Sequence, residues 1–181
     1  GAISTRAGET INNAGDANTY NSEEGVLFAE IAALSDDLTG RYITISDGTS
    51  LNGIRLYYGS TSKRITARYY VANTATASLT FSLSDETDFN KIAFKYKEND
   101  FSLWANGVKV ASDTSGAVNP PNTFDNLSFD LANTERFYGK TSQVQVFNTA
   151  LSDSELALLT GQGDNYDSYE AMRIALNYNI Q

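Results

Sequence analysis

The sequence predicts an all-β fold in which two antiparallel sheets pack face to face. Three observations predict it: apolar residues recur at every second position over most of the chain, short turn motifs separate these runs, and the only two prolines are adjacent, so that no strand is interrupted. Alternation with a period of two gives each strand one buried and one solvated side, which is typical of antiparallel sheets. The period changes only towards the C-terminus.

We expect residues 25–148 to form the two sheets. The alternation assigns twelve apolar side chains to their inner faces: Phe28, Ile54, Leu56, Ile65, Phe81, Ile92, Phe94, Leu103, Val108, Phe129, Val144 and Val146. The segment 26–34 is apolar more continuously, which predicts a central strand covered on both faces. Between the runs 101–105 and 108–111, Asn106-Gly107 predicts a type I′ hairpin turn, because both residues tolerate positive φ.

Two short helices are expected after the last strand. Ser152 and Glu155 have the spacing of a capping box, with Leu151 and Leu156 in the positions of a hydrophobic staple. Gly161 is expected to end this helix. A second cap-like pattern at 167–170 predicts another helix.

The second predicted helix covers residues 171–176, so that a helical appendage spans about 152–176. A chain of 181 residues fits one medium domain, and we expect a single domain over 1–181 with its core at about 25–160. The chain begins Gly-Ala-Ile without Met. We therefore expect it to be a domain of a longer protein.

Composition excludes several kinds of chemistry. The chain has no Cys and no His, so it has no disulfide, no thiolate or imidazole metal site, no cysteine nucleophile and no Ser-His-Asp triad. Its formal net charge of −9 argues against nucleic acid and anionic membranes as partners. No run of about 18 apolar residues is present, so we expect no membrane insertion. The charge is uneven, because residues 41–109 carry net +3 and the flanks carry net −12.

Two segments carry a resemblance to a known family. The segment 91–110 reads as strand, short turn, strand ending in Asn106-Gly107, and strand. The segment 139–156 reads as a final core strand followed by Leu-Ser-Asp-Ser-Glu at 151–155. Together they resemble laminin-G-like, concanavalin A-like domains over about residues 26–160. The resemblance implies a jelly-roll sandwich, in a family whose functions are diverse.

A narrower resemblance involves the ends of the chain. The segments 5–9, 24–30 and 169–180 resemble laminin-G-like modules of bacteriophage tail and virion proteins, which also occur in secreted proteins of gut and marine bacteria. This resemblance implies a location on a virion surface, such as a phage tail or appendage, or outside the cell. It also implies other subunits or domains of a larger assembly as partners.

Aromatic and basic residues on the polar phase of the 54–109 strands predict a carbohydrate-binding surface. Flat rings stack on the apolar faces of sugars, while Arg, Lys and Asn donate hydrogen bonds to hydroxyls or carboxylates. The candidate residues are Trp104, Tyr57, Tyr70, Arg55, Arg68, Lys95 and Asn106. The alternative is that loops or helices cover the polar side of a strand, in which case the single Trp is a core residue.

No catalytic residues are predicted. Relatives of this fold that are retaining glucanases carry a Glu-x-Asp-x-x-Glu pattern on one strand, which brings two carboxylates to about 5.5 Å. That pattern is absent from the acidic segments 85–88 and 98–100, and Glu30 has no acidic residue two positions away. No cofactor is predicted either. Calcium stays open without assigned ligands, its acidic candidates being Asp36-Asp37, Asp85/Asp88 and Asp164/Asp167.

The sequence therefore favours a non-catalytic carbohydrate-binding or adhesion module that recognises a polysaccharide or a bacterial surface glycan. A purely structural or interaction domain of a virion or cell-surface assembly, without a sugar site, is the alternative. A glycoside hydrolase or lyase comes third. Exposure of Trp104 and the tyrosines on one sheet face would separate the first two classes.

Overall fold

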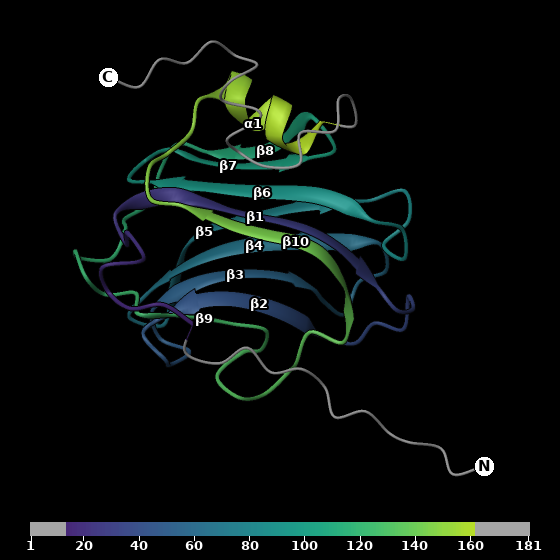
Figure 1. Cartoon of the computed structure of the whole chain (residues 1–181), viewed down its shortest axis with the longest axis horizontal. Helices are drawn as coiled ribbons and strands as arrows, with labels where there is room; N and C mark the ends of the chain where they lie inside the picture. The colour runs from purple at the N-terminus through teal and green to yellow at the C-terminus, as the bar shows by residue number, and fades with distance from the viewer. Residues whose placement is uncertain (1–13, 162–181) are drawn as a thin grey trace.

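The computed structural model describes residues 14–161, which form a two-layer β-sandwich with one helix (Figure 1). One five-stranded sheet has the order β10-β1-β6-β7-β8, and the other has the order β5-β4-β3-β2-β9. The elements in chain order are β1 (Glu24–Ala33), β2 (Arg41–Ser46), β3 (Gly53–Tyr58), β4 (Arg64–Val71), β5 (Thr74–Ser82), β6 (Asn90–Lys97), β7 (Phe101–Ala105), β8 (Val108–Asp113), β9 (Asn126–Ser128), β10 (Gly139–Phe147) and α1 (Asp153–Thr160).

All strand pairs are antiparallel, and the predicted all-β sandwich is confirmed. The main core lies between the sheets and buries most of the side chains that the alternation assigned to it: Ile54, Leu56, Ile65, Ile92, Phe94 and Leu103 are fully buried there, and Phe81, Phe129, Val144 and Val146 pack against it. Period two is thus a sound guide wherever only one side of a strand is apolar.

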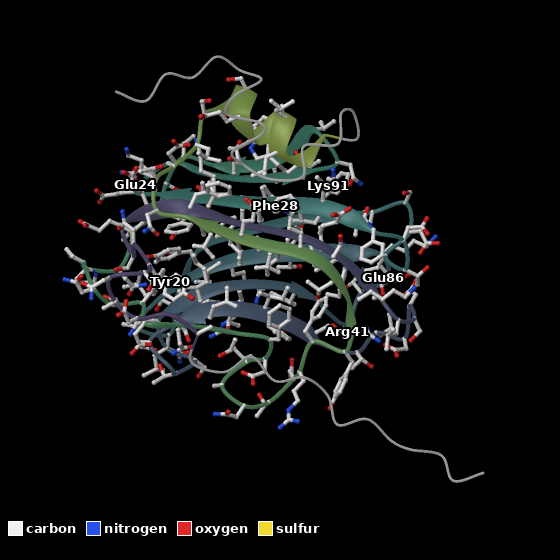
Figure 2. All side chains as sticks on the ribbon, viewed as in Figure 1. Tyr20, Glu24, Phe28, Arg41, Glu86 and Lys91 are labelled. Carbon is white, nitrogen blue, oxygen red and sulfur yellow. The ribbon has the colours of Figure 1, made fainter. Side chains whose placement is uncertain are left out.

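Two of the predicted core positions are wrong. Val108 is 61% exposed, because it begins the edge strand β8 directly after the hairpin turn. Phe28, labelled in Figure 2, is buried, but on the opposite side of β1 from the main core, where it clusters with Val26 and Leu156. Residues 26–33 are buried as predicted, except the half-buried Glu30, whereas Leu34 follows β1 and is 60% exposed. A strand that is apolar on both sides does not reveal which phase faces inward.

The predicted turn and helix start are both present. Asn106 and Gly107 have φ of 49° and 89°, as a type I′ turn requires. At α1, the Ser152 hydroxyl accepts a hydrogen bond from the Glu155 N–H, and the Glu155 side chain accepts one from the Ser152 N–H at 2.8 Å. Gly161 ends the helix, but with extended backbone (φ −66°, ψ 155°) rather than the left-handed conformation.

Helix α1 packs on the outer side of the first sheet, against β6, β7 and β8 (Figure 1). Leu151 and Leu156 are both buried there, in the same cluster. The second predicted helix, at 171–176, lies outside the described residues. Within residues 14–161, no helix is long and apolar enough to cross a membrane.

Candidate functional site

Four of the seven candidate residues meet on the outer face of the β5-β4-β3-β2-β9 sheet. Arg55 and Tyr57 lie on β3, and Arg68 and Tyr70 lie on β4. Each alternates with side chains that fill the main core, so all four point away from it. The register places Arg55 directly opposite Arg68. We call the surface formed by Tyr42, Arg55, Tyr57, Thr66, Arg68 and Tyr70 the Arg–Tyr face.

Each arginine on this face lies near a tyrosine ring of the neighbouring strand. The guanidinium of Arg55 lies 3.6 Å from the centroid of the Tyr70 ring, and that of Arg68 lies 5.7 Å from the centroid of the Tyr57 ring. Arg68 also donates hydrogen bonds from Nε to the Ser78 hydroxyl at 3.1 Å and from Nη1 to the Tyr70 hydroxyl at 3.4 Å. These contacts hold two cations and two flat rings in fixed positions on one surface.

Tyr42 on β2 extends the aromatic surface, and its role was missed in the sequence. Its ring stacks on that of Tyr57 with a centroid separation of 4.3 Å and an interplanar angle of 9°. Burial raises the pKa of Tyr57, and burial together with the neighbouring Glu135 carboxylate raises that of Tyr42. Both phenols are therefore neutral at physiological pH.

The two arginines have no acidic partner among the residues the structure describes. The ion pairs in residues 14–161 join Arg41 to Asp37, Lys95 to Asp100, Lys97 to Glu24 and Lys109 to Asp153. Like charges directly opposite one another on a sheet are destabilising. Arg55 and Arg68 thus form an uncompensated pair of positive charges, which is suited to an anionic ligand.

A hollow of about 140 Å³ adjoins Arg68 at the β3–β5 side of this face. Aromatic, cationic and hydroxyl-bearing side chains line it together with the β3–β4 loop: Tyr57, Gly59, Ser60, Thr61, Arg64, Thr66, Arg68 and Thr80. Such a lining combines a stacking surface with hydrogen-bond donors.

A second hollow, of about 120 Å³, opens at the β2–β9 side of the same sheet and was not predicted. Its lining is almost entirely polar: Thr44, Ser46, Gly48, Asn126, Ser128, Asp130, Ala132 and Asn133. The sequence contained a signal for it, because Asn126, Ser128 and Asp130 occupy the polar phase of the run whose apolar phase is Leu127/Phe129/Leu131.

The other three candidate residues lie elsewhere. Trp104 is on β7 of the opposite sheet, is 5% exposed, and donates from Nε1 to the Ser102 hydroxyl at 3.0 Å. It lies on the polar phase of its strand as predicted, but α1 covers that side, so the exposure needed for stacking on a sugar is absent. Trp104 is a core residue.

Lys95 and Asn106 have structural contacts on that same sheet. Lys95 is buried and pairs with Asp100 at 2.8 Å. Asn106 fixes the hairpin, since its side chain accepts from the Lys91 N–H at 3.0 Å and donates to Asn90 Oδ1 at 2.9 Å. The predicted surface thus divides into four residues on the Arg–Tyr face and three away from it.

The acidic candidates among the described residues lie on β1 and in loops between strands. Glu30 lies on β1, in register with Lys91 on one side and Gln143 on the other. Asp37 accepts hydrogen bonds from the Ser35 hydroxyl and from Arg41, and these bonds hold its pKa well below the ordinary range. In the part of the chain that the structure describes, no group of three or more Asp or Glu side chains is arranged to hold a metal ion. Asp164 and Asp167 lie outside that part.

Comparison with known proteins agrees with the observed architecture. A family model described as the concanavalin A-like lectin/glucanases superfamily matches residues 29–157. No curated protein matches the sequence.

Among solved structures, the sialidase module CBM40 of Ruminococcus gnavus IT-sialidase, bound to α2,3-sialyllactose, is similar with 20% identity and a TM-score of 0.65, over 85% of this chain and 97% of that one. A leech intramolecular trans-sialidase (18% identity, TM-score 0.65) matches 86% of this chain, and the NanB sialidase of Streptococcus pneumoniae (15%, 0.62) matches 83%. The matched regions make up only 27% and 26% of those two sialidases. On the family match, which spans most of its length, this chain belongs to the concanavalin A-like lectin/glucanases superfamily.

Proposed function

We propose that this chain is a non-catalytic carbohydrate-binding module that recognises an anionic glycan on the Arg–Tyr face. The observation that carries the proposal is the pair Arg55 and Arg68, opposed across two strands without a carboxylate partner in the described residues and set against Tyr57 and Tyr70. A surface that keeps two unpaired guanidinium groups side by side is stabilised by an anion that neutralises them.

The chemistry of the face suits a carboxylated sugar. A guanidinium group binds a carboxylate through two parallel charge-assisted hydrogen bonds. The half-buried Tyr42 and Tyr70 present aromatic surface to the apolar side of a sugar ring, while Thr66 and Thr80 bring hydroxyls to the adjoining hollow. An open site of this kind buries little area, so each copy is expected to bind with a Kd of roughly 10⁻⁴ to 10⁻³ M, and multiple copies supply avidity.

Two further observations support this proposal. The similar CBM40 structure was solved with sialyllactose, a glycan that carries a carboxylate. The chain also lacks the Glu-x-Asp-x-x-Glu pattern of retaining glucanases, and Glu30, its one acidic candidate in a strand, lies on the other sheet. Glycan recognition without cleavage is the function that these features favour.

We further propose that the module works outside the cell or on a virion surface, such as a phage tail, where a bacterial surface polysaccharide is the natural ligand. The phage setting rests on the resemblance of the terminal segments, most of which lie outside residues 14–161. A structural or interaction domain of such an assembly is the competing function, and it requires no glycan on the Arg–Tyr face.

Calorimetric titration distinguishes these functions. The ligands are sialyllactose, its methyl ester, a hyaluronan oligosaccharide and neutral lactose, and the proteins are wild type, Arg68→Gln and Lys140→Gln. Lys140 is an exposed cation on β10 of the opposite sheet and serves as the charge-matched control. We expect at least one acidic glycan to bind, with at least tenfold weaker binding by Arg68→Gln, unchanged binding by Lys140→Gln and weaker binding in high salt.

Equal affinity for the carboxylate and its methyl ester, or full affinity in Arg68→Gln, would contradict the assignment to the arginine pair. Absence of binding to every glycan at millimolar concentration would favour the structural function.

A further inference from the structure

We propose that the polar hollow between β2 and β9 is a second subsite, which takes an uncharged sugar unit next to the acidic one. The Arg–Tyr face and this hollow together would then bind a segment of an oligosaccharide chain rather than a single acidic sugar. This inference rests on the proposed function and assigns the substrate class of that same site.

The hollow is built from polar side chains that are themselves shielded. Thr44, Ser46, Asn126, Ser128 and Asp130 are each between 3% and 8% exposed, although they lie on the outward phase of β2, of β9 and of the segment that follows β9. Burying polar groups is costly unless hydrogen bonds compensate. A surface without a role in binding would gain stability from apolar residues at such positions.

Internal hydrogen bonds hold these groups in place. The Thr44 hydroxyl donates to the Asp130 backbone carbonyl at 2.9 Å, and the Ser128 hydroxyl donates to Asn126 Oδ1 at 3.3 Å. Asn126 in turn donates to Asp125 at 2.7 Å. The lining is therefore preorganised, and a ligand loses less free energy in ordering it.

Hydrogen-bonding capacity remains after these bonds are counted. The Asp130 carboxylate accepts one bond from the described residues, from the Asn133 N–H to Oδ1 at 3.1 Å. The Ser46 hydroxyl accepts from the Gly48 N–H at 3.2 Å and keeps its own proton. The Thr44 hydroxyl donates and keeps its lone pairs. Free acceptors and a free donor in one small hollow match sugar hydroxyls, which both donate and accept.

The charges of the lining residues indicate which sugar unit each site would bind. Asp130 repels a second carboxylate, so the β2–β9 hollow favours a neutral unit, whereas Arg55 and Arg68 favour the acidic one. The two sites are aligned, because Ser128, Thr44, Arg55 and Arg68 are cross-strand neighbours in a single row. At a strand spacing of about 4.8 Å, the row spans roughly 14 Å. That span exceeds one sugar ring, so one ligand reaches both hollows only as an oligosaccharide.

The test compares ligands of increasing length. Titration uses an acidic monosaccharide and an acidic tetrasaccharide that contains the same residue next to neutral sugars. The proteins are wild type, Asp130→Asn, Asn133→Gly and Arg68→Gln. Asn133 has φ of 67°, where glycine is unstrained, so Asn133→Gly removes a lining side chain without cost to the backbone. Asp113→Asn is the matched control, because Asp113 also caps a turn in its own strand–loop segment, in the opposite sheet.

Wild type should bind the tetrasaccharide about tenfold more tightly than the monosaccharide. Asp130→Asn and Asn133→Gly should each reduce that gain to about twofold and leave the monosaccharide Kd unchanged, while Asp113→Asn keeps the full gain. Melting curves establish that each variant is folded.

Three results would overturn the second subsite: no gain with length in wild type, a full gain in both hollow variants, or a gain that is lost on chelating calcium, which would make the hollow a cation site. Failure of the proposed function has a different signature, in which Arg68→Gln binds both ligands as wild type does or no glycan binds to wild type.

Discussion

The outer faces of the two sheets share a sequence pattern but differ in what covers them. Both carry an aromatic ring next to a cation: Lys109 lies 5.4 Å from the Trp104 ring on one face, and Arg55 lies 3.6 Å from the Tyr70 ring on the other. On the first, which we call the helix-covered face, α1 buries Val26, Phe28 and Trp104. An aromatic–cation pair therefore does not by itself identify a binding surface. Whether another element of the fold covers the pair decides whether a ligand can reach it.

The two faces also differ in whether their basic side chains form ion pairs. On the sheet that bears the helix-covered face, Lys95 pairs with Asp100, and Lys109 reaches Asp153 at the start of α1. On the Arg–Tyr face, neither arginine has an ion-pair partner in the described residues. A structural face neutralises its charges, whereas an unneutralised pair of like charges costs stability. We therefore expect substitutions on the helix-covered face to change stability and substitutions on the Arg–Tyr face to change binding.

The largest expected effect is on the helix-covered face. Trp104→Ala removes a 5%-exposed indole that packs beneath α1 with Phe28 and Leu156, and it should lower the free energy of unfolding by about 3–5 kcal/mol. Urea denaturation followed by circular dichroism measures the change. A loss below about 1 kcal/mol would show that α1 does not hold Trp104 in a packed core.

A smaller effect is expected where α1 begins. Ser152→Ala removes the hydroxyl that accepts from the Glu155 N–H, and should cost about 1 kcal/mol. Ser142→Ala, at an exposed position on β10, is the control, because it lies away from the helix cap. Equal midpoints of thermal unfolding for wild type and Ser152→Ala would contradict the role of the cap.

Substitution on the Arg–Tyr face should hardly change stability. Arg55→Gln loses the contact with the Tyr70 ring but also removes the repulsion from Arg68, so the free energy of unfolding should stay within about 0.5 kcal/mol of wild type. Chemical denaturation provides the measurement. A loss comparable to that of Trp104→Ala would make the arginine pair structural.

The smallest effect is a dependence on pH at the end of the sandwich where Arg41 and Glu86 lie (Figure 2). Bonds from Ser35 and Arg41 lower the pKa of Asp37 relative to about 3.9 in the unfolded chain. Its contribution to stability is therefore present above the unfolded pKa and lost as the pH falls through the lower folded pKa. The difference in urea midpoint between wild type and Asp37→Asn should shrink from pH 7 to pH 3.

Glu86 titrates in the opposite sense, because burial and the nearby Asp36 raise its pKa. It is common to wild type and Asp37→Asn, so the comparison of those two proteins isolates Asp37. A difference that is constant with pH would contradict the contribution of its charge.

Local features of the sequence determined much of this protein. The alternation around Ile54, Ile65 and Phe94 fixed the inner faces, the pair Asn106-Gly107 fixed a hairpin, and Ser152 with Glu155 fixed the start of α1. Each of these features depends on residues close together in the sequence, so backbone geometry and local apolar patterning specify it independently of the rest of the fold.

The tertiary structure decided what covers each strand and what meets across it. Phe28 and Trp104 became core residues because α1, some fifty residues or more away in sequence, packs over their side of the sheet. Asp130 meets Thr44 because β9 pairs with β2 across more than eighty residues. A position on the polar phase of a strand indicates only that the side chain points away from the main core. Whether solvent, a helix or a ligand lies there depends on long-range packing, which has no local signature in the sequence.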